Sequence, residues 1–152
     1  MVPDASPEVK PAPQVQNAAN QPLVREPLFE RGLRLFNQRS FFECHEVLED
    51  LWRPERGPRR LFLQAVIHFA VSFYHVQRHN LPGAERQLSK GLKKLAGYLP
   101  AFEGVNTERL YLSGIQFLER IGQRKNLKQF PKLTRAGRSK RSHAESPRPA
   151  RR

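Results

Sequence analysis

The sequence predicts an all-α protein, a single-domain bundle of about five helices with disordered N- and C-terminal tails. Apolar residues recur at helical spacing over roughly 26–122, whereas the alternation typical of strands is scarce. Turns rich in Pro and Gly divide this region into segments of helical length. A chain of 152 residues has room for one domain.

The composition of the two ends sets the expected domain boundaries. Residues 1–22 are rich in Pro, Ala, Gln and Asn, and residues 131–152 hold eight Lys or Arg, one Glu and three Pro. Neither end can bury enough apolar surface to offset the entropy of the chain. We therefore predict a disordered leader over 1–22, a helical domain over 23–128 and a disordered basic tail over 129–152.

The first three helices follow from apolar periodicity and capping signals. The first is expected from about 26 to 38. The second should begin after Ser40, which forms a capping box with Glu43, and should extend to about residue 53. The third, from about 59 to 78, is apolar nearly all round, which is typical of the central helix of a bundle.

Two more helices complete the bundle. Asn80 should cap the fourth helix, and Gly91 lies beside its leucine stripe, where it would allow close contact with a neighbour. Pro100 ends this helix, and Asn106 or Thr107 should begin the fifth. The residues expected to face inward from the fifth helix are Tyr111, Ile115, Leu118 and either Ile121 or Gly122.

Polar stripes run along two helices that should otherwise be buried. In the second helix, His45, Glu49 and Trp52 share one face, with Glu46 at its margin. The stripe of the third helix consists of Gln64, His68, Ser72 and His75. Burying such groups costs a few kcal/mol each unless they find partners. We therefore expect the two stripes to meet in the interior.

Three interpretations of this polar site remain open. In the first, His45 and Glu49 bind a divalent transition metal together with His68, His75 or both, and Glu46 acts as a base on bound water. In the second, the groups line a metal-free pocket for a small ligand, with a carboxylate–imidazole pair poised for proton transfer. The expected lining is His45, Glu46, Glu49, Trp52, Gln64 and His75. In the third, a closed hydrogen-bond network fixes the register of the helices.

The net charge of +13 is concentrated partly in the C-terminal tail. Such a tail favours nucleic acid or another polyanion, although a solubilising end without a dedicated partner has the same composition. The candidate polyanion-binding residues are Lys132, Arg135, Arg138, Lys140 and Arg141. Two function classes follow: a small enzyme or ligand binder that uses the polar site, or a non-catalytic module whose tail docks on nucleic acid or ribonucleoprotein.

The cysteine count and the hydropathy pattern bear on the compartment. Cys44 is the single cysteine, which suits a reducing environment, and burial of its small side chain is expected. The N-terminus lacks the pattern of a secretory signal, and no stretch reaches about 18 uninterrupted apolar residues. We expect a cytoplasmic protein with no transmembrane segment.

Several of these motifs together resemble the domain of unknown function 309 family. The segment 41–52 (FFECHEVLEDLW) resembles its signature, as do Leu63–Ile67, Tyr74–His75 and Asn80–Ala84. The resemblance covers about residues 27–100. It implies a small all-helical domain found in bacteria, archaea and plastids, which makes the plastid stroma an alternative compartment, and it implies no established activity.

The resemblance also marks individual positions. Its characteristic residues correspond here to Glu43, His45, Glu46, Glu49, Trp52, Gln64, His75, Asn80 and Gly83. Ala65 stands where the family usually has Gly, which would tighten any cavity there. His68 does not belong to the family's pattern, so its place in the site rests on helical spacing alone.

Overall fold

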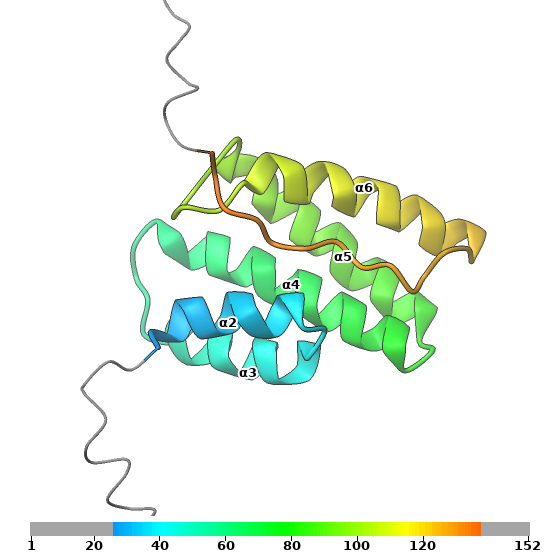
Figure 1. Cartoon of the computed structure of the whole chain (residues 1–152), viewed down its shortest axis with the longest axis horizontal. Coiled ribbons are helices and arrows are strands. Elements are labelled where there is room, and N and C mark those ends of the chain that lie inside the picture. Colours follow the sequence, from blue (N-terminus) through cyan, green and yellow to red (C-terminus); the bar gives the residue numbers. More distant parts are fainter. Residues whose placement is uncertain (1–25, 138–152) are drawn as a thin grey trace, which may run out of the picture.

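The computed structural model describes residues 26–137, and most of this region is helical. The helices are α2 (Leu28–Asn37), α3 (Phe41–Trp52), α4 (Arg59–Gln77), α5 (Leu81–Leu95), the short 3₁₀ helix η1 (Ala96–Tyr98) and α6 (Thr107–Gln123). The all-α fold class with five main helices is confirmed (Figure 1). The predictions for 1–22 and for most of the tail lie outside the described residues.

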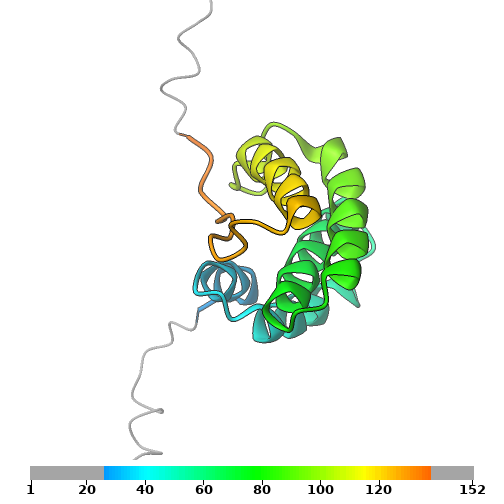
Figure 2. The same cartoon turned by 90° about the vertical axis from the view of Figure 1, so that its right-hand side faces the viewer.

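Helix α4 is the centre of the bundle, as its nearly uniform apolar composition predicts. It packs against α3 on one side and against α5 on the other. Its buried residues cover more than half of its circumference, which requires neighbours on several sides, and the half-buried polar stripe occupies the rest. In the view along the helices, α2, α3, α4, α5 and α6 follow one another around an arc (Figure 2).

A cluster of phenylalanine rings forms the interior. Phe73 of α4 lies 5.8 Å from Phe36 of α2, 5.4 Å from Phe41 of α3 and 5.0 Å from Phe117 of α6, measured between ring centroids. Phe130, which follows α6, lies 5.3 Å from the same ring. These spacings and tilted orientations are the favourable ones for aromatic pairs. One side chain of α4 therefore connects three other helices and the C-terminal segment.

The segment after α6 belongs to the packed domain, which reaches past the boundary of 128 expected from composition. It runs back between α6 and α2 (Figures 1 and 2). Leu133 is buried, and its backbone exchanges two hydrogen bonds with the Asn37 side chain, of 2.9 and 2.8 Å. The backbone N–H of Asn106 donates to Thr134 O at 2.8 Å. The basic composition of the segment did not indicate this packing, because the packing buries only Pro131, Leu133 and backbone groups, while the basic side chains stay exposed.

Helices α2 and α3 are joined by a tight turn. Arg39 is left-handed, with φ 67°; its N–H donates to Phe36 O, and the N–H of Ser40 donates to Leu35 O. This pair of bonds is the Schellman ending of α2. The Ser40 side chain makes no capping bond, so the predicted capping box is wrong. In a capping box the Glu43 carboxylate would accept a hydrogen bond from the Ser40 N–H. Here that N–H already donates to Leu35 O at the end of α2.

The other two predicted caps are confirmed. The Asn80 side chain accepts a hydrogen bond from Gly83 N at 3.1 Å, and the Asn106 side chain accepts one from Arg109 N at 2.9 Å. Each bond satisfies a backbone N–H that has no partner within its own helix. These caps fix where α5 and α6 begin.

Glycines bring α5 and α6 close to α4. A Cβ at Gly91 of α5 would stand 2.8 Å from the Phe69 ring, which confirms the close contact expected there. A Cβ at Gly114 of α6 would stand 2.9 Å from the same ring.

The approach at Gly114 selects the buried face of α6. Its buried residues are Thr107, Leu110, Gly114, Phe117 and Ile121. The inward orientation predicted for Ile115 is therefore wrong, since 37% of this residue is exposed. Only Gly lets the helix approach Phe69, so α6 is turned by about one residue from the face that the larger apolar side chains suggested.

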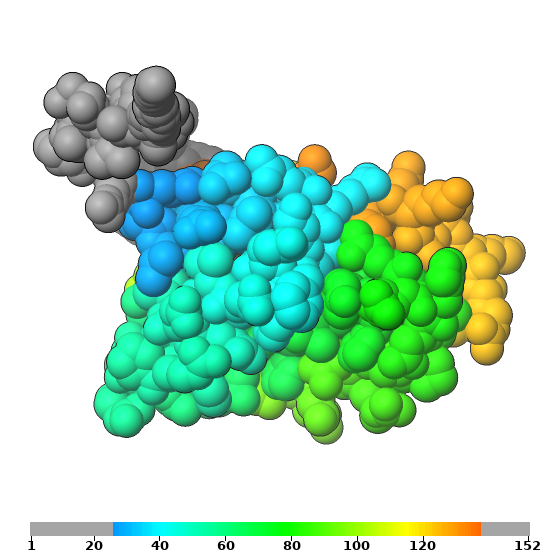
Figure 3. All heavy atoms as spheres, turned by 90° about the horizontal axis from the view of Figure 1, so that it is seen from below, coloured from blue at the N-terminus to red at the C-terminus, as the bar shows by residue number. Residues whose placement is uncertain are grey.

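The space-filling view shows how the N-terminal helices lie against the turn between α4 and α5. The blue and cyan atoms of α2 and α3 border the green atoms around residues 75–85, and the orange atoms after α6 border the green atoms in turn (Figure 3).

Candidate functional site

The two polar stripes meet at a cavity of about 240 Å³ between α3, α4 and α5, which is open to solvent and lined mostly by half-buried residues rather than enclosed in the interior. Its lining consists of His45, Glu49, Trp52, Gln64, Ile67, His68, Val71 and Gln87. Five residues singled out from the sequence are thus brought together: His45, Glu49, Trp52, Gln64 and His68. Spacing along α3 and α4 places them there because each stripe keeps to one face of its helix.

His45 and Glu49 lie one turn apart on α3. The ring Nδ1 of His45 is 2.8 Å from Phe42 O, so it donates to that carbonyl and its Nε2 faces Glu49. The distance from Nε2 to Glu49 Oε2 is 3.7 Å. The other carboxylate oxygen of Glu49 accepts from Arg53 Nη2 at 3.1 Å. The two residues thus form a carboxylate–imidazole pair in which the distance between Nε2 and Oε2 is slightly longer than a hydrogen bond.

His68 of α4 is oriented by α5. Its Nδ1 is 2.8 Å from Gln87 Oε1, so this nitrogen carries the proton and Nε2 is left with its lone pair. Burial lowers the pKa of His68 below its ordinary value. The hydrogen bond to Gln87 raises this pKa, but the nearby charges of Lys94 and Lys90 lower it further, and the net shift is downward. The imidazole is therefore held neutral and presents an acceptor.

Trp52 is held in place by Arg60, in the first turn of α4. The Arg60 guanidinium lies over the indole ring, 4.1 Å from its centroid, and donates to Trp52 O at 2.8 Å. The stacking is a cation–π contact that fixes the ring plane. A rigid aromatic wall therefore closes one end of the cavity.

Two buried polar atoms of the lining residues have no hydrogen-bond partner among the described residues. They are Trp52 Nε1, a donor, and His68 Nε2, an acceptor in the tautomer set by Gln87. A buried polar group without a partner costs about 1–3 kcal/mol, and few such groups occur in native proteins. Both atoms belong to residues that line the cavity, but each atom is itself buried rather than open to it.

Glu46 lies on the outer side of this site. It is exposed, and it borders a neighbouring hollow of about 370 Å³ lined by His45, Glu46, Glu49, Asp50 and Arg53. His45 and Glu49 thus line both spaces. Glu46 therefore lines the outer hollow and not the cavity itself.

Two other members of the α4 stripe do not line the cavity. The buried Ser72 hydroxyl donates to Ala84 O at 2.7 Å, so its polar group is satisfied by α5. His75 lies seven residues after His68, about 10 Å further along the helix, and its Nδ1 is 3.3 Å from Asn80 Nδ2. The stripe stays on one face of α4, but it extends over about three turns of the helix, so its members cannot all line one cavity.

The candidate metal ligands do not form a cluster. Within residues 26–137 there is no group of three or more His, Cys, Asp and Glu side chains that could hold a metal ion. His45, Glu49 and His68 line the same cavity, but their side chains do not converge closely enough to hold one ion, and His75 does not line the cavity.

Cys44 is buried, as expected, and faces away from this chemistry. Its Sγ is 3.3 Å from Gly32 O, at the contact between α2 and α3. Burial raises the pKa of the thiol to about 12. A thiol in this state is not a nucleophile at neutral pH.

Gln87 is a site residue that the sequence did not single out. It lies one turn before Gly91, and a Cβ at Gly91 would stand 3.1 Å from His68 Cβ. The close approach at Gly91 therefore places the residue one turn earlier beside the α4 stripe. That spacing is the signal that could have identified it.

The candidate polyanion-binding residues divide between two regions. Lys132 is exposed on the packed segment after α6, and Arg135 in the same segment pairs with Glu30 of α2. Arg138, Lys140 and Arg141 lie outside the described residues. No helix within 26–137 is long and apolar enough to cross a bilayer.

Comparison with known proteins confirms the family resemblance. Residues 29–87, which carry α2, α3, α4 and the start of α5, match the family described as "Domain of unknown function (DUF309)". The polar site lies within this stretch.

One relative carries a name of its own. The chain is 32% identical over 71 residues to "Uncharacterized protein YpuF" of Bacillus subtilis (strain 168), an alignment that covers 46% of this chain and 41% of that protein. The chain thus spans less than half of that relative's length. No solved structure shows a significant match.

Proposed function

We propose that this domain binds a small polar molecule in the cavity between α3, α4 and α5. The observation that carries the proposal is the pair of buried atoms without partners, Trp52 Nε1 and His68 Nε2, in residues lining the same cavity. Because both atoms are buried in this structure, the two rings must shift slightly to reach a guest. A guest that then accepts a hydrogen bond from the indole and donates one to the imidazole removes both costs.

The size and lining of the cavity define the class of guest. Its volume of about 240 Å³ falls below the range of about 300–1,000 Å³ typical of drug-sized ligands, so the guest has few heavy atoms. The two apolar lining residues are Ile67 and Val71, and the remaining lining is polar or aromatic. A primary amide group fits this requirement, because its NH₂ donates and its carbonyl accepts.

His45 and Glu49 give the site a charged edge that faces the outer hollow. Their polar atoms are 3.7 Å apart, and Glu49 is also tied to Arg53. In this proposal the pair orients a polar guest as it enters from the hollow beside Glu46, and no reaction is assigned to it.

The test uses acetamide as the probe and N,N-dimethylacetamide, which lacks the donor, as its matched control. Trp52 is the single tryptophan, so one indole N–H signal in the ¹H–¹⁵N spectrum reports on the cavity. We expect acetamide to shift this signal saturably and dimethylacetamide to shift it at least tenfold more weakly.

Two variants complete the experiment. His68→Phe removes the acceptor while keeping a ring, and it should abolish the saturable shift; the rest of the spectrum shows whether the variant is folded. Gln116→Ala, on the exposed face of α6, should leave the shift unchanged. Equal responses to the two amides, or an unchanged response in folded His68→Phe, would refute the proposal.

A further inference from the structure

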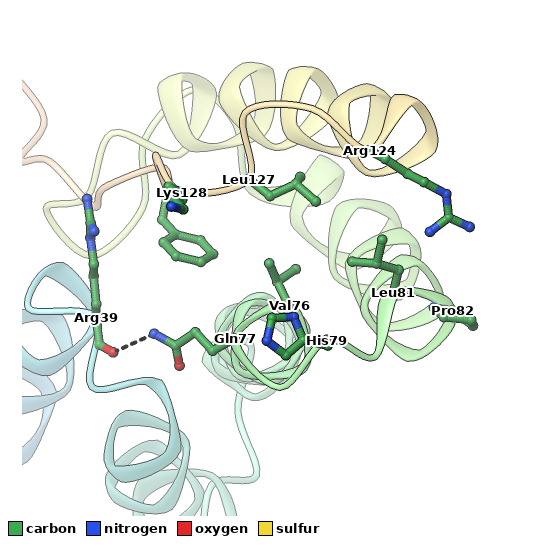
Figure 4. Close-up of a pocket in the computed structure, with 10 residues that line it drawn as sticks. Arg39, Val76, Gln77, His79, Leu81, Pro82, Arg124, Leu127 and Lys128 are labelled. Atoms are coloured by element: carbon green, nitrogen blue, oxygen red, sulfur yellow. Dashed lines mark hydrogen bonds between the residues drawn. The ribbon is translucent and has the colours of Figure 1, made fainter.

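A larger pocket lies at the C-terminal end of α4, opposite the end where Arg60 holds Trp52. Its volume is about 610 Å³, and it forms where α2 and α4 end, α5 begins and the chain leaves α6 (Figure 4). The lining consists of Arg39, Val76, Gln77, His79, Leu81, Pro82, Arg124, Leu127, Lys128 and Phe130. None of these residues lines the cavity described above.

The pocket has an apolar floor and a basic rim. Val76, Leu81, Leu127 and Phe130 supply the apolar surface, and Val76 is buried in the core. Arg39 and Arg124 stand on opposite sides of the view, and Lys128 lies between Arg39 and Leu127 (Figure 4).

No acidic residue lines this pocket. Within residues 26–137, moreover, Arg39, Arg124 and Lys128 take part in none of the ion pairs, which involve other residues. Three full positive charges thus surround an apolar surface without a protein counter-charge.

The helix ends around the pocket do not cancel this charge. The C-terminal ends of α2, α4 and α6 each carry about half a negative charge, and the N-terminal end of α5 about half a positive charge, so their sum is about −1. The carbonyls at the ends of α2 and α4 also accept Schellman bonds, such as the one from Asn80 N to His75 O at 2.8 Å. The three cations therefore leave the pocket clearly electropositive.

The backbone at the rim is the second observation. Arg39, His79 and Arg124 all adopt left-handed conformations, with φ of 67°, 62° and 58°. Glycine is the residue usually found at such helix ends, because a Cβ is unfavourable there. Three helices thus end on a basic residue where glycine would fit better, and all three residues line one pocket. Such conformational cost is often found where the side chain has a function.

We propose that this pocket is a second, independent binding site, and that it takes a small amphipathic anion. The apolar part of the ligand lies on Leu127, Phe130 and their neighbours, while its anionic group pairs with the guanidinium and ammonium groups of the rim. The volume suits a ligand of one or two rings, and the unpaired positive charges at the rim favour a ligand with negative charge.

The test uses three probes that separate the two halves of the proposed ligand. Naphthalene-1-sulfonate carries both the apolar body and the anion, 1-naphthalenemethanol carries the body alone, and sulfate carries the anion alone. With the full chain, calorimetric titration should show one saturable site for naphthalene-1-sulfonate, at least tenfold tighter than for either of the others. The affinity should fall as salt concentration rises.

Matched triple variants locate the site. Arg39→Gln, Arg124→Gln and Lys128→Gln together should weaken naphthalene-1-sulfonate binding at least tenfold. Arg86→Gln, Lys93→Gln and Arg109→Gln change the net charge equally at exposed positions outside the pocket, and this control should bind like the wild type. Circular dichroism establishes that both proteins fold.

Three outcomes would overturn the proposal. If 1-naphthalenemethanol binds as tightly as the sulfonate, the pocket does not select an anion. If sulfate binds equally well, the basic rim is a surface cluster without a pocket. If the two triple variants lose affinity equally, the effect is one of net charge alone.

Discussion

Arg124 adopts a backbone conformation that glycine adopts more easily than other residues. It lies in the left-handed region with φ 58°, at the end of α6, where its N–H donates to Ile121 O. For a residue with a Cβ this conformation costs about 1–2 kcal/mol, while glycine adopts it freely. Placing an arginine at the rim of the larger pocket thus lowers the stability of the backbone locally.

This cost can be measured by comparing two substitutions. Arg124→Gly and Arg124→Ala both remove the charged side chain, but only glycine relieves the backbone. We expect the glycine variant to exceed the alanine variant by about 1 kcal/mol in free energy of unfolding. Urea unfolding followed by Trp52 fluorescence gives both values. Equal stabilities would mean that the left-handed conformation costs nothing here.

The buried imidazole of His68 predicts a dependence of stability on pH. Its pKa in the folded protein is lowered by burial, so the unfolded chain takes up a proton first as the pH falls. The stability that neutral His68 contributes is present above about pH 6.5, the ordinary histidine pKa, and is lost as the pH drops through the lowered value. We therefore expect the difference in unfolding free energy between wild type and His68→Asn to shrink between pH 7.5 and pH 5.

Urea titrations of the two proteins at both pH values measure this difference. The comparison cancels the titration of groups that the variant leaves unchanged. A difference that stays constant, or grows toward pH 5, would contradict the lowered pKa.

At the scale of the helices, contact between α4 and α5 depends on Gly91. An added Cβ would meet Phe69 at 2.8 Å and the backbone oxygen of Ala65 at 3.1 Å, and neither can move without disturbing α4. We expect Gly91→Ala to lower the free energy of unfolding by about 1–3 kcal/mol. Gly122→Ala is the matched control, since nothing lies within 4 Å of its added Cβ, and it should be neutral or stabilise by up to about 1 kcal/mol.

Thermal unfolding by circular dichroism compares the two alanine variants with the wild type. The prediction fails if Gly91→Ala is as stable as Gly122→Ala. The experiment also bears on the polar site, because the same contact brings Gln87 to His68.

Helix positions were largely predictable, whereas helix orientation was not. Apolar spacing and Asn caps placed all five helices within a few residues, since both signals are local. The buried face of α6 was misjudged because it is selected by Gly114, which has no side chain to contribute to a hydrophobic stripe. The capping box at Ser40 failed because the end of α2 uses the same backbone N–H.

At the scale of the whole molecule, the segment after α6 acts as a strap between α2 and α6. Ending the chain after residue 130 removes the buried Leu133 and both bonds to Asn37. We expect this truncation to cost on the order of 3 kcal/mol of unfolding free energy, from one buried leucine and the lost hydrogen bonds. Ending it after residue 137 keeps the strap and should leave stability unchanged.

Urea unfolding of the full chain and the two truncated chains tests this prediction. If the chain ending at 130 is as stable as the chain ending at 137, the strap contributes nothing to the fold. The chain ending at 137 is then also the proper reference for any experiment on the basic tail.

The polyanion prediction belongs to residues 138–152, which contain six Lys or Arg and one Glu. We expect the full chain to bind a single-stranded RNA oligomer with an affinity that falls steeply with salt, and the chain ending at 137 to lose this binding. Fluorescence anisotropy at several salt concentrations measures both proteins. Undiminished binding by the shortened chain would assign the charge effect to the helical domain instead.

The sequence by itself determined the class of the fold, the central place of α4 and the membership of most of the polar cavity. These features follow from periodicity along single helices, which depends on neighbours a few residues apart. Only the tertiary structure decided that His75 lies apart from the cavity, that Gln87 joins it, and that Arg39, His79 and Arg124 surround one pocket. These residues come from different elements, and the distances between them are set by how closely helices approach, which the glycines and the strap control.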